Sequence, residues 1–318
     1  MGTPEFAVPS LKALAGCGQI AVDAVITQPD KPRGRGMKIE PSPVKKTSEE
    51  LQIPVYQPIK LTPESLSTLL SSLPRLDFIF VVAYGKKIPK WLLETPKYGC
   101  INLHPSLLPK YRGGAPIQRA IFNGDRETGV TTMYLDEGWD TGDIILQETV
   151  PIPSEADWGI LSNMLAHRGA DLLVQTVIQI LAGVAPRIKQ DESKATHEPL
   201  LSPEDEWIDW SQPAEFIQNR IRGLSPEPAA KTWFRGNLLK IIRASLVPSL
   251  SPPSSAGKIL SSDKKGILVG TGTCAISLDL VKPHGKKTMS GTDFRNGHRV
   301  EVGEVFYTDH PNVVDGSQ

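Results

Sequence analysis

The first half of the chain alternates short apolar runs with longer segments that carry apolar residues at helical spacing. The short runs lie at residues 20–28, 77–85, 99–104, 129–135 and 143–152. The longer segments lie at residues 4–16, 63–73, 115–124 and 160–183. This alternation is typical of an α/β domain in which helices connect the strands of a parallel sheet. The pattern therefore predicts a doubly wound, mostly parallel sheet.

The first helical segment raises a question about the strand that should precede it. Thr3 followed by Pro4 is a helix start, with a capping side chain and then proline at the first helical position. In a doubly wound sheet such a helix follows a buried strand, yet only Met1 and Gly2 come before Thr3. We expect either that the sheet lacks a strand or that the printed chain is short at its beginning.

The second half has a different pattern. An acidic, irregular stretch, QDESKATHEPLLSPEDEWIDW, is predicted to be a linker, and a helical segment follows it. Beyond that helix, short apolar runs are cut by Gly, Ser and Pro, which favours a small β-barrel. We predict an α/β domain over residues 1–190, an acidic linker over 191–210 and a β-barrel domain over 211–318.

Charge is unevenly distributed, although the 35 basic and 35 acidic residues cancel over the whole chain. Residues 220–299 hold 14 Lys or Arg and 4 Asp or Glu, a net charge of +10, so the remainder carries −10. This asymmetry favours binding of a polyanion, and a solvated basic surface without a partner is the alternative.

Three scattered cysteines fit neither a disulfide framework nor a zinc cluster, which indicates a reduced, cytoplasmic setting. No apolar run reaches membrane-spanning length and no leader pattern is seen, so neither membrane insertion nor secretion is expected.

Two polar residues, Asn102 and His104, close the third apolar run, and Pro and Gly then break the pattern. Successive side chains on a strand point to opposite faces, so Asn102 and His104 share a face. Open α/β sheets bind ligands at the carboxyl ends of their strands. The pair is therefore a candidate site. A capping asparagine and a satisfied core histidine are the alternative.

A Gly-rich turn, LDEGWDTGDI, offers Asp136, Asp140 and Asp143 as partners for this pair. Aspartates in turns usually bond their own backbone. A carboxylate beside an imidazole can instead fix its tautomer and stabilise its cation. If the turn brings Asp140 to His104, an amide and an imidazolium together face a developing oxyanion, as acyl transfer requires.

A basic loop, TQPDKPRGRGMKIEPSPVKK, contains Lys31, Arg33, Arg35 and Lys38 among Gly and Pro residues that predict mobility. Such a loop could grip phosphates, and an exposed loop without a ligand is the alternative. Neither a dinucleotide fingerprint after a predicted strand nor a phosphate-binding P-loop is present in the sequence. The remaining histidines lack metal-ligand spacing.

Together these motifs resemble the methionyl-tRNA formyltransferases, a family of formyl-tetrahydrofolate-dependent enzymes, over nearly the whole chain. The resemblance is carried by GTPEFAVPSL, TQPDKPRGRG, VVAYGKKIP, GCINLHPSLLPKYRGGAPIQRAI, DEGWDTGDI and GKKTMSGTDFRNGHRVEVGEVF. The N-x-H-x-S-L-L-P run, with a D-x-G-x-D-T-G-D turn further along, is specific to folate-dependent formyltransferases as a group. The basic loop and the barrel narrow the resemblance to the tRNA members. It implies a Rossmann-like formyltransferase domain followed by an OB-like barrel that binds tRNA.

The resemblance implies transfer of the formyl group of 10-formyltetrahydrofolate to the free amino group of methionyl-initiator tRNA. Folate would be a co-substrate, and no metal is implied. The implied catalytic residues are Asn102, His104 and Asp140. The implied folate-binding residues are Ser106, Leu107, Leu108 and Pro109, and the implied tRNA-binding residues are Lys31, Arg33, Arg35 and Lys38. We expect a cytoplasmic monomer that engages no membrane.

Family members usually have several apolar residues before GTPEF, so the chain is expected to begin inside or after its first strand, with an upstream start codon missed. The rival functions are formyl transfer to a sugar nucleotide or a purine precursor, hydrolysis of formylfolate, and RNA binding on a non-catalytic scaffold. The basic loop and barrel favour the tRNA enzyme over the sugar-nucleotide enzyme. Intact Asn102, His104 and Asp140 argue against a non-catalytic protein.

Overall fold

The computed structural model describes residues 1–33, 38–73, 75–247, 256–264 and 266–309. The chain forms two compact units. The first contains residues 1–116, 127–151 and 162–199, and the second contains 117–126, 152–161 and the chain from residue 200 onward. The predicted boundaries at residues 190 and 210 stay a proposal. Within the described ranges, no helix is both long and apolar enough to cross a membrane.

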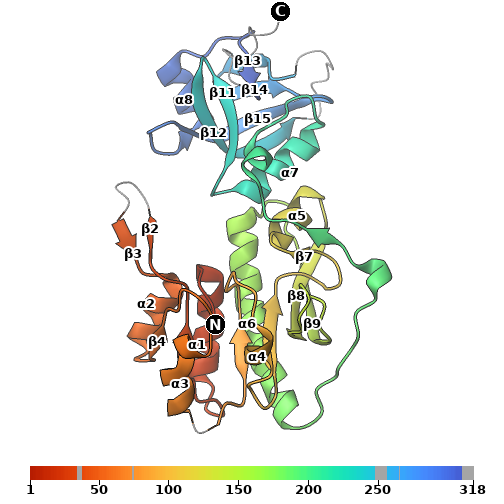
Figure 1. Cartoon of the computed structure of the whole chain (residues 1–318). Coiled ribbons are helices and arrows are strands. Elements are labelled where there is room, and N and C mark those ends of the chain that lie inside the picture. Colours follow the sequence, from red (N-terminus) through yellow and green to blue (C-terminus); the bar gives the residue numbers. More distant parts are fainter. Residues whose placement is uncertain (34–37, 74, 248–255, 265, 310–318) are drawn as a thin grey trace, which may run out of the picture. The chain divides into compact units, whose positions relative to one another are not determined.

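A mixed sheet runs through the first unit (Figure 1). Four strands lie in the order β5-β6-β8-β9, with bounds β5 Ile79–Val81, β6 Cys100–His104, β8 Glu127–Tyr134 and β9 Ile144–Pro151. The β5 and β6 strands are parallel, whereas β8 is antiparallel to both of its neighbours. The strands β1 Val25–Ile26 and β4 Val55–Tyr56 form a parallel pair. The predicted α/β sheet is confirmed, with an antiparallel portion at β8 and β9.

The first two residues join β1 to β5. The amide of Gly2 donates to the carbonyl of Ile26 at 3.1 Å, and the amide of Val82 donates to the carbonyl of Met1 at 2.9 Å. Gly2 and Val82 form an isolated parallel bridge. The two groups of parallel strands therefore meet through the start of the chain.

Helices fill the connections between these strands, as the apolar spacing predicted. Their bounds are η1 Glu5–Ala7, α1 Val8–Gly16, α2 Pro43–Glu50, η2 Glu64–Leu66, α3 Ser67–Ser72, α4 Lys90–Leu93, α5 Pro116–Phe122 and α6 Trp158–Leu181. The long helix α6 packs on the sheet, because the hydroxyls of Thr176 and Thr132 lie 2.7 Å apart. The predicted cap at Thr3 is wrong, since its hydroxyl donates instead to the carbonyl of Tyr84 at 3.3 Å.

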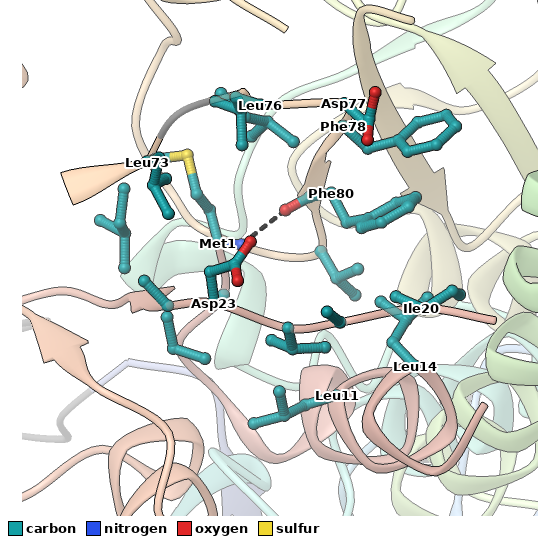
Figure 2. A pocket seen from close by; sticks show the side chains of 18 of the residues that line it. Met1, Leu11, Leu14, Ile20, Asp23, Leu73, Leu76, Asp77, Phe78 and Phe80 are labelled. Atoms are coloured by element: carbon teal, nitrogen blue, oxygen red, sulfur yellow. Dashed lines mark hydrogen bonds between the residues drawn. The ribbon is translucent and has the colours of Figure 1, made fainter. Parts of the chain in front are cut away.

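The strand predicted at residues 20–28 is also wrong in its first part. Only Val25–Ile26 forms a strand, and residues 20–24 line a cavity of about 420 Å³. Figure 2 shows apolar side chains around this cavity, together with the Met1 amino group, which donates to the carbonyl of Phe80. Burial lowers the pKa of that amino group to about 5. A strand needs a neighbour to pair with, and the described residues offer none beside residues 20–24.

Filling this cavity with an apolar segment is expected to stabilise the protein. In the chain as printed, the folded amine loses its proton above about pH 5, whereas its ordinary pKa is 8.0. The unfolded state therefore binds more protons in that window, and the free energy of unfolding rises from pH 5 to pH 8. An extension of about six apolar residues, a usual strand length, moves the amine away. Each large side chain that it buries adds about 1.5–3 kcal/mol. We expect Tm at neutral pH to rise by at least about 5 °C.

The matched control is an equally long Gly/Ser extension, which moves the amine but fills nothing. This control should flatten the pH dependence of unfolding, and well above pH 8, where the amine is neutral in both states, it should leave Tm nearly unchanged. Equal melting temperatures for the two extensions would contradict the prediction that the cavity accepts a strand.

Among its described residues, the second unit contains a curled antiparallel sheet accompanied by helices (Figure 1). Its strands lie in the order β13-β14-β15-β12-β11-β17, with β16 paired to β15. Their bounds are β11 Ala230–Phe234, β12 Asn237–Val247, β13 Ile259–Asp263, β14 Gly266–Gly270, β15 Ala275–Pro283, β16 Met289–Ser290 and β17 Phe306–Tyr307. The helices are α7 Ala214–Leu224 and α8 Gly291–His298, after a short turn η4 Pro203–Glu206.

One segment, residues 303–307, touches both edges of this sheet. Ile259 donates its amide to the carbonyl of Glu304 at 2.7 Å, and Phe306 pairs with Phe234 of β11. The curled sheet encloses an apolar core that includes Ile241, Ile276 and Phe294. The predicted barrel is confirmed, although β11 and α8 were not foreseen.

Candidate active site

The last residue of β6, His104, lies beside Asp140. Its Nδ1 is 3.7 Å from Oδ2 of Asp140, and the two side chains are 6% and 14% exposed. On the other side of the ring, Nε2 lies 2.9 Å from the carbonyl oxygen of Tyr111. A carbonyl only accepts, so Nε2 carries a hydrogen and Nδ1 is the nitrogen that exchanges a proton beside Asp140. The predicted association of His104 with Asp140 is confirmed.

Asn102 lies two residues earlier on the same strand. In the register of the sheet it is opposite Met133 of β8, and His104 is opposite Thr131. All five residues of β6 are buried, and Asn102 is 8% exposed. Within the described part of the chain, the Asn102 carboxamide has no hydrogen-bond partner. The carboxamide is not among the buried polar atoms that lack a partner, so it keeps contact with solvent and can donate to a ligand.

Asp140 is held in an unusual backbone conformation. Its φ is 54°, in the left-handed region that Asp tolerates better than most residues. Its Oδ2 accepts a hydrogen bond of 2.8 Å from the amide of Gly113. The carboxylate therefore contacts both the loop after β6 and the imidazole of His104.

The other two aspartates of the turn have structural partners. Oδ1 of Asp136 accepts from the amide of Gly138 at 2.9 Å and from the hydroxyl of Thr141 at 2.7 Å. Oδ2 of Asp143 accepts from Nε of Arg187 at 2.9 Å. Asp136 thus bonds its own turn, as aspartates in turns usually do. Asp140 is the aspartate that faces the imidazole.

The segment Ser106 to Pro109 forms a fixed turn directly after β6. The Ser106 hydroxyl is fully buried and donates to the carbonyl of Lys110 at 2.6 Å. Leu108 is 3% exposed, and its amide donates to the Thr131 hydroxyl at 3.2 Å. Leu107 and Pro109 are half-buried, so their side chains are the parts of the turn most open to a ligand. A role for the four residues in folate binding stays a prediction.

Comparison with known proteins places the chain in a family. A family model described as "Formyl transferase" matches residues 1–177, and one described as "Formyl transferase, C-terminal domain" matches residues 200–299. The methionyl-tRNA formyltransferase of Pelotomaculum thermopropionicum is 48% identical over 305 residues, 96% of each chain. That of Moorella thermoacetica is 48% identical over 306 residues, 96% of this chain and 97% of its own. The chain belongs to the methionyl-tRNA formyltransferase family.

A solved structure with lower sequence identity to this chain shares its fold. It is the N-formyltransferase of Helicobacter canadensis in complex with folinic acid and dTDP-3-aminofucose. The TM-score is 0.63 at 20% sequence identity, over 87% of this chain and 97% of that one. This likeness concerns the fold alone.

The basic loop of the chain is flanked by β-strands. Two short strands, β2 Lys31–Arg33 and β3 Lys38–Glu40, pair antiparallel at the flanks of the loop that was predicted to be mobile (Figure 1). Lys31 is exposed, and Arg35 lies outside the described residues. At the base, Asp30 accepts from Lys45 and Gln57 at 2.7 Å each, and these bonds hold its pKa below the usual range. A role for the loop residues in tRNA binding stays a prediction.

Two residues that the sequence reasoning missed complete the surroundings of Asp140. The guanidinium of Arg112, which is 1% exposed, lies 2.8 Å from Oε1 of Gln190 through Nη2. Gln190 in turn donates to the carbonyl of Asp140 at 2.8 Å. Arg112 and Gln190 are 78 residues apart, and no periodic pattern connects such positions. The sequence feature that could have indicated Arg112 is an arginine followed by two glycines shortly after a strand end.

The predicted linker is also more regular than expected. Strand β10 His197–Glu198 pairs in parallel with β7 Arg112–Gly113, and a short turn, η3 Glu192–Lys194, precedes it. The prediction of an irregular linker is wrong here, because backbone groups of the loop after β6 supply pairing partners. The linker therefore lies against the loop whose Gly113 amide bonds Asp140.

The basic region of the second unit is partly neutralised. Arg220 pairs with Asp205 at 3.3 Å, and Arg235 pairs with Glu304 at 2.6 Å. Both acids lie outside residues 220–299, so the field at the surface is weaker than a net +10 suggests. No group of three or more His, Cys, Asp or Glu side chains within the described residues could hold a metal ion.

Proposed function

We propose that this chain transfers the formyl group of 10-formyltetrahydrofolate to the α-amino group of methionyl-initiator tRNA. The observation that carries the proposal is the contact of 3.7 Å between Nδ1 of His104 and Oδ2 of Asp140. Asn102 lies two residues before His104 on the same strand. The name shared by relatives at 48% identity supports methionyl-tRNA as acceptor. The folinic acid in the Helicobacter canadensis structure supports a folate as formyl donor.

The reaction begins with attack on the formyl carbon. The neutral amine of the methionyl ester forms the new C–N bond, and the carbonyl electron pair moves to oxygen. The Asn102 carboxamide and the protonated Nδ1 of His104 donate hydrogen bonds to this oxyanion. A donor of this kind contributes about 2.7–4 kcal/mol to transition-state stabilisation.

Collapse of the adduct completes the transfer. The added amine loses a proton, the bond from the formyl carbon to N10 breaks, and N10 receives a proton. The products are the N-formyl amide and tetrahydrofolate, so atoms and electrons balance without a redox step. His104 gives the proton of Nδ1 to N10 as the bond to N10 breaks, and the neutral Nδ1 then takes up the proton that the amine releases. Asp140 stabilises the imidazolium at the start and at the end of this exchange.

The binding assignments follow the same proposal. Folate lies against the turn of Ser106, Leu107, Leu108 and Pro109. Phosphates at the acceptor end of the tRNA contact Lys31, Arg33, Arg35 and Lys38, and the basic barrel lies along the acceptor arm. The chain acts as a monomer in the cytoplasm, where its tRNA substrate is used.

One assay tests the proposal. The protein is incubated with 10-formyltetrahydrofolate and charged initiator tRNA, and formylmethionine released from the tRNA is measured. We expect formylation that requires both substrates. Transfer to a dTDP-amino sugar instead, or release of formate from the folate without tRNA, would replace this function with one of its rivals.

Binding of tRNA should weaken steeply with salt. If the basic residues contact several phosphates, the affinity should fall at least about 100-fold between about 50 and about 200 mM salt, because bound counterions are released. Lys31→Ala should reduce the slope of the log–log plot by about 0.7–0.9, the value for one phosphate contact. Filter binding measures both, with Lys12→Ala, an exposed lysine of α1, as the control. A salt-independent affinity would remove the proposed phosphate contacts.

A further inference from the structure

We propose that Arg112 and Gln190 are positioning residues that hold Asp140 against His104. This inference rests on the function proposed above, because it concerns how the same site is kept in its reactive geometry. Neither side chain is proposed to touch the substrates.

A three-residue segment sets the distance between the imidazole and the carboxylate. The carbonyl of Tyr111 accepts from Nε2 of His104 at 2.9 Å. Two residues later, the amide of Gly113 donates to Oδ2 of Asp140 at 2.8 Å. A Cβ on Gly113 would lie 2.3 Å from the carbonyl oxygen of Glu198, so the close approach requires glycine. The same short stretch of backbone thus positions both reactive side chains.

Arg112, the middle residue of that segment, is buried, and each of its three guanidinium nitrogens donates a hydrogen bond. Its Nη1 and Nη2 donate to the two carboxylate oxygens of Glu192 at 2.8 and 2.7 Å. Its Nε and Nη2 donate to Oε1 of Gln190 at 3.1 and 2.8 Å. A buried guanidinium presents donors only, so it fixes which end of the Gln190 carboxamide faces it.

The other end of that carboxamide holds the turn that carries Asp140. Nε2 of Gln190 donates to the carbonyls of Asp140 and Gly142, both at 2.8 Å. Asp140 has a positive φ of 54°, a conformation that costs free energy and is stabilised by contacts such as these. Asp140 is therefore restrained twice, at its carboxylate by Gly113 and at its carbonyl by Gln190.

The linker ties this arrangement together. Thr196 accepts from the amide of Tyr111 through its hydroxyl at 2.7 Å and from the amide of Arg112 through its carbonyl at 2.9 Å. Residues 190–198 thus supply both the carboxamide and the backbone partners of the segment after β6. Displacing this part of the linker would loosen the contact between His104 and Asp140.

Gln190→Glu is the variant that tests the inference. Glutamate keeps the acceptor that faces Arg112 but turns an acceptor, in place of the amide donor, towards the carbonyls of Asp140 and Gly142. We expect kcat to fall about 10- to 100-fold, as for small misplacements of reacting groups. The KM values for both substrates should stay within about threefold, because ground-state binding is untouched. The matched control is Arg187→Ala, which removes a contact to the same turn through Asp143 and should leave kcat within about twofold of the parent.

A double substitution separates positioning from general destabilisation. In an Asp140→Asn background, single-turnover measurements should show that Gln190→Glu adds less than about a twofold loss, because its effect passes through the missing carboxylate. An undiminished loss in that background would overturn the inference. If Gln190→Glu fails to fold, Gln190→Met, which adds no charge but removes both the donor and the acceptor that faces Arg112, allows the same comparison.

A measurement without substrates keeps this inference distinct from the proposed function. In protein labelled with ¹⁵N-histidine, Gln190→Glu should shift the ring nitrogen resonances of His104, and Arg187→Ala should not. If the parent protein does not formylate tRNA but these shifts occur, the function fails and the positioning role stands. Unchanged His104 resonances in Gln190→Glu would overturn the positioning role whatever the parent catalyses.

Discussion

His104→Ala is expected to lower kcat for formylation by about 10³- to 10⁴-fold, the upper part of the range for a proton-transferring side chain. The substitution removes the donor at Nδ1 that the proposal assigns to the oxyanion, and it removes the carrier of the proton that passes from the amine to N10. Affinity for tRNA should stay nearly unchanged, because the side chain is 6% exposed and lies at the end of a buried strand. Single-turnover formylation measures kcat, and filter binding measures the affinity.

The control for this variant is His167→Ala, an exposed histidine of α6 in the first unit. It should formylate at the parental rate. A His104→Ala protein as active as the parent, with an unchanged melting temperature, would end the assignment of His104 as a catalytic residue.

Asp140→Asn is expected to lower kcat by about 10²- to 10⁴-fold, as when an imidazole loses the carboxylate that orients it. Asparagine has the same volume and keeps an oxygen that can accept from Gly113, which now accepts at 2.8 Å. It cannot stabilise a positive charge on His104, whose Nδ1 lies 3.7 Å from the present carboxylate. The loss should therefore appear in kcat, with little change in Tm.

Asp136→Asn is the matched control, because Asp136 lies in the same turn and bonds Gly138 and Thr141 instead of His104. Its oxygen can still accept those bonds, so activity should stay within about twofold of the parent. Equal losses for Asp136→Asn and Asp140→Asn would show that the turn's integrity, and not the carboxylate beside His104, limits the reaction.

The elements predicted best are those whose pattern is local. Strand β6 was predicted with Asn102 and His104 on one face, because side-chain alternation follows from the strand's own backbone. The helix α6 was predicted from its apolar stripe, which repeats over 24 residues. Both signals are contained within the segment that folds.

Elements whose limits depend on a neighbour were predicted less well. Residues 20–24 have strand-like composition, yet they line a cavity because the described residues provide no pairing partner. The linker shows the opposite case. It was predicted to be irregular, yet His197 and Glu198 pair as a strand with the loop after β6. Hydrogen bonds between strands require a second segment, and composition does not say where that segment lies.

The sequence alone was enough to name Asn102, His104 and Asp140 as candidates, because an amide, an imidazole and a carboxylate are the groups that acyl transfer uses and each stands at a strand end or turn. Only the tertiary structure showed how Asp140 is held beside His104. That arrangement depends on a buried guanidinium, a carboxamide that it orients and one backbone amide, contributed by Arg112, Gln190 and Gly113. Such contacts join positions 27 to 78 residues apart, and folding alone brings them within hydrogen-bonding distance.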